Sequence, residues 1–280
     1  MAKTLMVSTC GTSLLNAAAS DDQRQAILRL ANAAGADIRA DDRGLIDNAG
    51  WAAEGKLLRE NSPLTEKCKM SAELSSMLLY YGGQFPTDAE NARSQHHILI
   101  STDTYVGRAA ADAIGKFLRN TGMAAEVLPI DRLRTNSFAD FQYGLDGIIA
   151  WCARTIPGYR QEGFKVVFNL SGGFKSVLGW MQTLGVIYAD ECIYTFERTD
   201  ELLRIPRLPL RSADFSEDVR AFVANHVDFF APLAERGGKR PADELPAGAP
   251  EILFRPVGGD VELSSMGRLI WEQVRRTHYQ

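Results

Sequence analysis

The chain has 280 residues, with 31 Lys and Arg against 35 Asp and Glu, so its net charge is −4 with histidine neutral, and 45% of its residues are hydrophobic. This composition is that of a globular protein, and it excludes disorder, collagen and coiled coil as descriptions of the whole chain. The length allows one large domain, or a large and a small one. The acidic balance argues against the broad basic surface that long DNA or RNA needs, whereas a short anionic ligand in a local pocket remains allowed.

The spacing of the cysteines and the first residues of the chain bear on the cellular compartment and on metal binding. The four cysteines, Cys10, Cys68, Cys152 and Cys192, lie far apart and form no Cys-x-x-Cys pair. We therefore expect reduced thiols, no metal and no cofactor. The apolar stretch at the N-terminus is too short for a signal-peptide core, and no apolar run approaches the roughly 18–20 residues of a membrane span. We expect a cytoplasmic protein without membrane association.

Short apolar segments alternate with amphipathic ones along the first part of the chain. Strands are predicted over 4–9, 97–101, 125–129, 164–168, 192–196 and 202–205, the last two as a hairpin around Arg198–Asp200. Helices are predicted after Gly11 and over 106–117, 138–151 and 177–186. This alternation predicts an α/β fold: an open, mainly parallel, Rossmann-like sheet with helices on both faces. Residues 20–95 are mostly helical by pattern, so we expect a helical insertion between the first two core strands.

The pattern changes after Arg211. We predict one amphipathic helix over 214–235, a proline- and glycine-rich loop over 237–250, short strands at 252–254 and 261–263, and a helix over 264–276. Helix, two strands and helix resemble part of a winged-helix module. The expected organisation is therefore a domain over 1–210 and a small helical, winged-helix-like extension over 211–280.

Three loops at predicted strand ends are rich in glycine and small hydroxyl residues: Thr9–Ser13, Ser101–Thr104 and Asn169–Lys175. In an open parallel sheet the ligand lies beyond the carboxyl ends of the strands, where backbone N–H groups and helix dipoles can face an anion. Helix capping is the alternative for each loop, and it is favoured for the second. In the third loop Lys175 would stand at a helix N-terminus against the dipole preference, a conflict that a bound anion would resolve.

Two familiar phosphate motifs fail on spacing. The Walker loop needs a glycine directly before its lysine, and here Phe174 precedes Lys175. The dinucleotide fingerprint needs three spaced glycines after the first strand, and Cys10-Gly-Thr-Ser-Leu-Leu does not supply them.

The chain resembles the CARF (CRISPR-associated Rossmann fold) family. The resemblance is carried by Thr9-Cys-Gly-Thr-Ser13-Leu-Leu, Leu133-Arg-Thr-Asn-Ser-Phe138 and Asn169-Leu-Ser-Gly-Gly-Phe-Lys175, and it covers about residues 1–210. It is nearest to the ring-nuclease branch with a small C-terminal extension. The resemblance implies a homodimer that binds cyclic oligoadenylate, the second messenger of type III CRISPR antiviral defence and most often the four-adenosine ring, on its two-fold axis.

The ring-nuclease resemblance also implies a reaction. A ribose 2′-hydroxyl attacks the adjacent phosphate without a metal ion and leaves a 2′,3′-cyclic phosphate, which switches the signal off. Ser13 would orient the 2′-hydroxyl or a phosphate oxygen, and Lys175 would stabilise the developing charge. No general base can be named from the sequence. The expected ligand-binding residues are Thr9, Cys10, Gly11, Thr12, Ser101, Thr102, Asp103, Thr104, Arg132, Arg134, Asn169, Ser171, Gly172, Gly173 and Phe174.

Three alternatives stay open at this point. The protein could bind the ring without cleaving it. It could be a ligand-activated ribonuclease, because Arg220-Ala-Phe-Val-Ala-Asn-His226 matches the Arg-x(4–6)-His of HEPN domains, although about one such match is expected by chance. The C-terminal part could bind DNA, but from Lys239 onward its acidic residues equal its basic ones, whereas a recognition module has a basic excess. For this C-terminal part we favour a role in bracing the dimer or covering the site over DNA binding.

Overall fold

The computed structural model describes residues 2–33, 37–59, 61–195, 201–206, 217–235 and 237–278. The chain divides into two compact units, Met1–Gly144 with Ile156–Arg207, and Leu145–Thr155 with Leu208–Gln280. The domain boundary predicted after residue 210 lies outside the described residues. The second unit also includes Leu145–Thr155, which is the middle of a long helix earlier in the chain. The prediction divided the chain into two consecutive segments and therefore could not assign this piece to the second unit.

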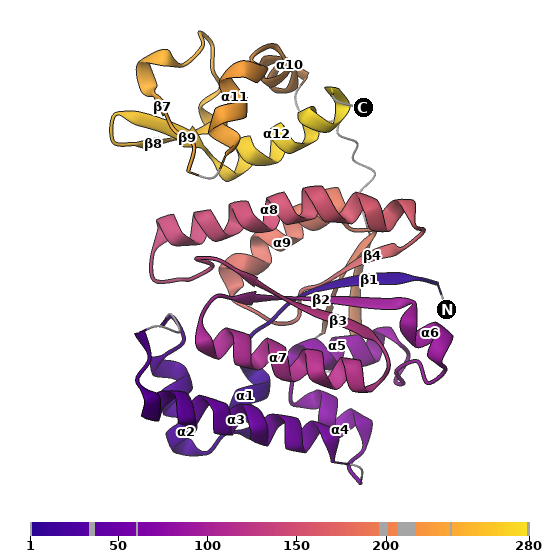
Figure 1. The fold of residues 1–280 in the computed structure, drawn as a ribbon. Coiled ribbons are helices and arrows are strands. Elements are labelled where there is room, and N and C mark those ends of the chain that lie inside the picture. The colour runs from indigo at the N-terminus through magenta and orange to yellow at the C-terminus, as the bar shows by residue number, and fades with distance from the viewer. Residues whose placement is uncertain are drawn as a thin grey trace. The chain divides into compact units, whose positions relative to one another are not determined.

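The first unit is built on a six-stranded sheet in the order β3-β2-β1-β4-β5-β6 (Figure 1). The neighbouring strands from β3 to β5 pair in parallel, and β6 pairs antiparallel with β5. All six predicted strands are therefore confirmed, while the predicted turn around Arg198–Asp200 lies outside the described residues. The strands are β1 Thr4–Thr9, β2 Gln95–Thr102, β3 Ala124–Ile130, β4 Lys165–Asn169, β5 Glu191–Thr195 and β6 Leu202–Pro206.

The strand register brings several carboxyl ends to one edge of the sheet. Thr9 lies opposite Ile100 of β2, and Ser8 lies opposite Asn169 of β4. The strand order runs outward in both directions from β1 and β4, so these two strands flank the topological switch point. Open α/β sheets bind their ligands at this place.

The helices cover both faces of the sheet, which confirms the predicted fold class (Figure 1). Between β1 and β2 the predicted helical insertion contains α1 Ser13–Ala18, α2 Asp21–Arg29, α3 Ala40–Leu58, α4 Leu64–Lys69, α5 Ala72–Tyr80 and α6 Ala89–Arg93. The crossover helices are α7 Tyr105–Asn120, α8 Phe138–Gln161 and α9 Lys175–Tyr188. None of the described helices is both long enough and apolar enough to cross a membrane.

Helix α8 continues well beyond residue 151, where the sequence pattern predicts its end. It contains Pro157, which removes one backbone hydrogen bond from the helix. Ile156 is fully buried directly before this proline and continues the apolar face. Packing of that face therefore outweighs the loss at Pro157.

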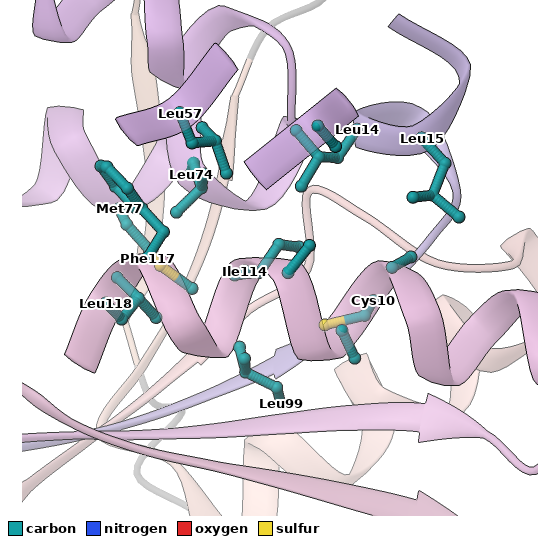
Figure 2. Packing of buried hydrophobic residues seen from close by; sticks show 14 of the residues in the cluster. Cys10, Leu14, Leu15, Leu57, Leu74, Met77, Leu99, Ile114, Phe117 and Leu118 are labelled. Carbon is teal, nitrogen blue, oxygen red and sulfur yellow. The ribbon is translucent and has the colours of Figure 1, made fainter. Parts of the chain in front are cut away.

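The main core lies between the sheet and the helices of the insertion together with α7. Strand residues that point to this face, Met6, Leu99, Val167 and Ile193, form one apolar cluster with helical residues such as Leu74 and Ile114 (Figure 2). On the opposite face α9 lies close against the sheet. A Cβ added at Gly185 of α9 would stand 2.3 Å from Sγ of Cys192, so only glycine fits there.

The second unit contains, outside its part of α8, two helices, a small antiparallel sheet in the order β7-β9-β8, and a last helix. An apolar cluster that includes Val223, Phe230, Leu253 and Trp271 holds it together. The winged-helix likeness stays a prediction. The elements are α10 Glu217–Asn225, α11 Val227–Ala234, β7 Arg240–Pro241, η3 Ala242–Glu244, η4 Glu251–Leu253, β8 Phe254–Val257, β9 Asp260–Leu263 and α12 Ser265–His278.

Three sequence predictions for this unit need correction. The single helix predicted over 214–235 is two helices over its described part, because the ring Nδ1 of His226 bonds the Phe222 carbonyl at 2.8 Å, and the His226 backbone N–H bonds Val223 instead. The loop predicted over 237–250 contains β7, which pairs with β9, and the turn η3. The strand predicted at 252–254 begins with η4 and becomes extended only at Phe254.

We predict that Leu99→Ala lowers the free energy of unfolding by about 2–5 kcal/mol, because it leaves a cavity where a fully buried leucine (0% exposed) packs between β2 and α7. Urea denaturation measures the change. Leu28→Ala is the control, since Leu28 on α2 is 73% exposed and its truncation should stay within about 0.5 kcal/mol. Equal losses in the two variants would contradict the assignment of the core.

Candidate functional site

The loops that follow β1 and β4 meet at the switch point. Thr9 donates a hydrogen bond from Oγ1 to the carbonyl of Gly172 at 2.5 Å. Gly173 has φ +98°, and a Cβ added there would stand 2.9 Å from Cβ of Thr9. A Cβ added at Gly11 would stand 3.0 Å from the backbone N of Gly173. The first and third loops of the sequence analysis are thus in direct contact, and their glycines make this contact sterically possible.

A buried glutamate that sequence reasoning missed lies against both loops. Glu73, in the first turn of α5, is fully buried. Its Oε1 accepts a hydrogen bond from the backbone N–H of Gly11 at 2.7 Å, and its Oε2 accepts one from Oγ of Ser71 at 2.6 Å. A Cβ added at Gly172 would stand 1.9 Å from Oε1. The insertion therefore places a carboxyl group where the two loops converge.

The sequence offers no signal that separates Glu73 from an ordinary helix start. Ser71 caps α5 by accepting from Leu74, and an acidic residue in the first turn is what a capped helix usually carries. The contacts of Glu73 with the loops join segments that are distant in the chain, and only the fold reveals them.

Burial raises the pKa of the Glu73 carboxyl above its ordinary value. Hydrogen bonds from Gly11, Ser71 and Ser13 lower the pKa, but they do not cancel the effect of burial. The group therefore holds its proton more tightly than an exposed glutamate does.

Ser13, the predicted catalytic serine, is half-buried at the start of α1 and faces the start of α5. Its Oγ accepts a hydrogen bond from the backbone N–H of Ala72 at 3.3 Å, and a hydrogen bond from its side chain lowers the pKa of Glu73. A hydroxyl has one proton to donate and two lone pairs that accept. After these two interactions Ser13 keeps one lone pair for another donor.

Two residues predicted at the ligand have their side chains in the interior. Cys10 belongs to the apolar cluster drawn in Figure 2, and burial, followed by the charge of Glu73, raises the pKa of its thiol well above the usual range. Asn169 is fully buried; its Oδ1 accepts from Oγ of Ser76 at 2.7 Å, and its Nδ2 donates to the carbonyl of Glu73 at 3.1 Å. Both side chains are therefore engaged within the protein, where they hold the core and α5 in place, and ligand contacts of Cys10 and Asn169 stay a prediction.

The helices α1 and α9, which begin at the switch point, differ from the others at their N-termini. Each of the other α-helices in the described part of the chain has a side-chain cap or an acidic residue in its first turn. Helices α1 and α9 have neither. The first residue of α9 is Lys175, which is exposed and forms no ion pair with a described residue. Unsatisfied N–H groups, the positive ends of two helix dipoles and an ammonium group therefore gather at one place.

The remaining predicted residues of these two loops have local partners. Oγ1 of Thr12 accepts from Asn16 at 3.1 Å, and Oγ of Ser171 accepts from the backbone N–H of Thr195 at 3.0 Å. Phe174 is half-buried and precedes α9 without capping it. These contacts connect the loops to the neighbouring helix and strand.

The second loop is tied to its own helix and to the loop after β3. Thr104 caps α7 by accepting from Gly107 at 3.1 Å and is bonded to Thr102 at 2.7 Å, so the favoured capping role is confirmed for Thr104. Ser101 is fully buried. Asp103 accepts two hydrogen bonds from the Arg134 guanidinium, at 2.8 and 2.6 Å.

Arg132 and Arg134 are held differently. The backbone N–H of Arg132 donates to Asp103 at 3.1 Å. Burial alone would raise the pKa of Asp103, but the bonds from Arg134 and Arg132 outweigh it and lower that pKa. The Arg134 side chain is 20% exposed in this pair, whereas that of Arg132 is 56% exposed and its guanidinium lies 4.7 Å from the ring centre of Tyr143.

We predict that Gly172→Ala lowers the free energy of unfolding by about 1–3 kcal/mol, because its methyl group would displace the buried Glu73 carboxyl. Gly179→Ala, within α9, is the control. A Cβ at Gly179 meets nothing within 4 Å, so this variant should be about 0.5–1 kcal/mol more stable than the wild type. Chemical denaturation of both variants compares them, and an unchanged Gly172→Ala protein would contradict the packing described.

Comparisons with known proteins place the chain in a family. The model of the family described as CRISPR-associated protein (Cas_APE2256) matches residues 68–208, which is half of the 280-residue chain. A solved structure, Enterococcus italicus Csm6 bound to cyclic hexa-2′-fluoro-hexa-dAMP, matches with a TM-score of 0.39 and 11% identity over 83% of this chain and 48% of that one. The chain thus spans about half the length of that protein. No curated protein matches. By the extent of the family match, this chain belongs to the CRISPR-associated protein family Cas_APE2256.

Proposed function

We propose that the protein binds a cyclic oligoadenylate at the switch point between β1 and β4, as a CARF-type ring nuclease. The observation that carries this proposal is the junction of α1 and α9, where two uncapped helix N-termini meet beside the exposed ammonium group of Lys175. Free backbone N–H groups and the helix dipoles favour a phosphate there. The family membership supplies the CRISPR context in which such a ligand is a signal.

The ring would lie on the two-fold axis of a homodimer. A four-adenosine ring has two-fold symmetry, so identical loops of both subunits would meet equivalent phosphates. The local character of the site agrees with the net charge of −4, because a few N–H groups and one lysine per subunit suffice for a short anion. In this arrangement the first unit is the ligand-binding part.

The loops after β2 and β3 would support the ring from the side. Arg134 is engaged by Asp103 through two hydrogen bonds, so it positions these loops. Arg132 has the more exposed side chain, whose Nε lies 4.0 Å from Oδ1 of Asp140, and it is the arginine that would meet a phosphate or a base.

The proposed reaction is cleavage of the ring by its own ribose. A 2′-hydroxyl attacks the adjacent phosphorus, the bond from phosphorus to the 5′-oxygen breaks, and a 2′,3′-cyclic phosphate end remains. The loops would hold the attacking and leaving oxygens in line, and Lys175 would stabilise the charge on the phosphorane. Ser13 would accept a hydrogen bond from the 2′-hydroxyl with its remaining lone pair. The nucleophile belongs to the substrate, so this proposal uses no metal ion.

We predict that the wild type converts cyclic tetra-adenylate into linear products with 2′,3′-cyclic phosphate ends in the presence of EDTA. Lys175→Ala should lower the single-turnover cleavage rate by about 10²–10³-fold, because it removes a charge that faces the transition state. Chromatography of the products measures both. Lys116→Ala is the control: Lys116 pairs with Glu54 near the end of α7, away from the switch point, and its loss should leave cleavage unchanged.

Different results would choose among the alternatives. Tight binding with an intact ring would make the protein a sensor without nuclease activity, and absence of binding would overturn the ligand. Cleavage of linear RNA only when the ring is present would favour the ligand-activated ribonuclease. In the structure the His226 ring packs on Phe222, with centroids 4.3 Å apart, as expected of a packed histidine.

A further inference from the structure

We propose that Glu73 is a positioning residue that takes up the proton of the attacking 2′-hydroxyl through Ser13. This inference rests on the proposed function and deepens it, because it supplies the proton acceptor that the sequence does not reveal. Glu73 lies inside the insertion, and the loops of the site close over it.

The contacts of Glu73 go beyond those that helix capping requires. Its two oxygens accept from Gly11 and Ser71, which belong to different segments of the chain. Gly172 leaves the space that the carboxyl group occupies, since a Cβ there would overlap Oε1. The protein therefore encloses an acid between both loops that would hold the phosphates. Burying an acid costs free energy, which its hydrogen bonds offset only in part, so its presence here asks for an explanation.

Ser13 connects this acid to the open side of the site. Its Oγ accepts from the backbone N–H of Ala72, the residue directly before Glu73, at 3.3 Å, its side chain lowers the pKa of the Glu73 carboxyl, and one lone pair remains. A 2′-hydroxyl that donates to this lone pair completes a chain from the ribose through Ser13 to the carboxylate. Glu73 is fully buried and acts through Ser13.

The proton transfers balance along this chain. The 2′-hydroxyl gives its proton to Oγ of Ser13 while Ser13 gives its own proton to Glu73, so the serine is unchanged at the end. The new bond forms between the 2′-oxygen and phosphorus as the bond from phosphorus to the 5′-oxygen breaks. The 5′-oxygen takes its proton from water, and Glu73 later returns its proton to water.

The surroundings of Glu73 suit a proton acceptor. Burial raises the pKa of its carboxyl above the ordinary value, so the carboxylate is a stronger base than one on the surface. The groups that face it from α1, α5 and the two loops are Ser13, Ser71, Gly11 and Gly172, all uncharged. At the end of β1 the Cys10 thiol, whose pKa is raised well above its usual range, stays neutral.

The test is Glu73→Gln in the full-length protein, with cyclic tetra-adenylate as the probe. Glutamine keeps the shape and an oxygen for the Gly11 N–H, but it cannot accept a proton. The single-turnover rate should fall about 100-fold or more, while the affinity for the ring changes little. The wild-type rate should rise with pH through an apparent pKa above that of an ordinary glutamate and then level off, and the variant should lack this rise.

A folding control accompanies the rate measurement. The raised pKa of Glu73 in the folded protein stabilises the fold below the unfolded-state pKa, and this contribution is lost as pH rises through the folded-state pKa. Glu73→Gln should therefore melt no lower than the wild type at neutral pH. Glu66→Gln, an exposed change on α4, should leave rate and affinity unchanged and lower the melting temperature only slightly, because Glu66 lies in the first turn of that helix.

The outcomes separate this inference from the proposed function. A wild type that leaves the ring intact overturns the cleavage on which the inference depends. A wild type that cleaves, together with a Glu73→Gln protein of similar rate and the same pH profile, overturns the inference alone. A variant that loses ring affinity and cleavage equally also overturns it, because Glu73 would then only shape the binding loops.

Discussion

The contact between the loops after β1 and β4 is the constraint on which the rest of the site depends. Parallel pairing aligns the ends of these strands, and the bond from Thr9 to the Gly172 carbonyl joins the loops. A side chain at Gly11 would press on the backbone of Gly173, and a side chain at Gly173 would meet Cβ of Thr9. Because the loops touch, the N-termini of the helices that follow them, α1 and α9, start from the same junction.

This arrangement concentrates positive potential that the protein only partly satisfies. The Gly11 N–H is bonded to Glu73, so one donor of the first loop is already used inside the protein. Among the residues that the structure describes, the start of α9 has no comparable partner, and it carries Lys175 where most described helices carry an acid or a capping side chain. The two sides of the junction thus differ: the α1 side is tied to a buried acid, and the α9 side presents an exposed lysine.

The sequence predicts the sheet, and the loops that meet at its switch point, better than it predicts the side chains that surround these loops. Apolar strands with small-residue loops suffice for both, since the rule of the switch point supplies the place. Strand alternation also contained information about Cys10, which lies on the side of Met6 and joins its apolar cluster. Glu73 and the bonds of Asn169 could not be predicted, because α5 and the two loops meet only through the tertiary fold. The interruption between α10 and α11 at His226 also could not be predicted, because it depends on a hydrogen bond between the His226 ring and the Phe222 carbonyl of the preceding helix.

The helical insertion therefore helps to shape the candidate site. Its helix α5 reaches the first loop through Glu73 and the end of β4 through Ser76 and Asn169. The family match begins at residue 68, just before these residues, and runs through the third loop. If the insertion only covered one face of the sheet, apolar residues would suffice at the start of α5. A carboxyl group, with the desolvation it costs, is explained by contacts to both loops, and the geometry of the loops and the position of α5 therefore depend on each other.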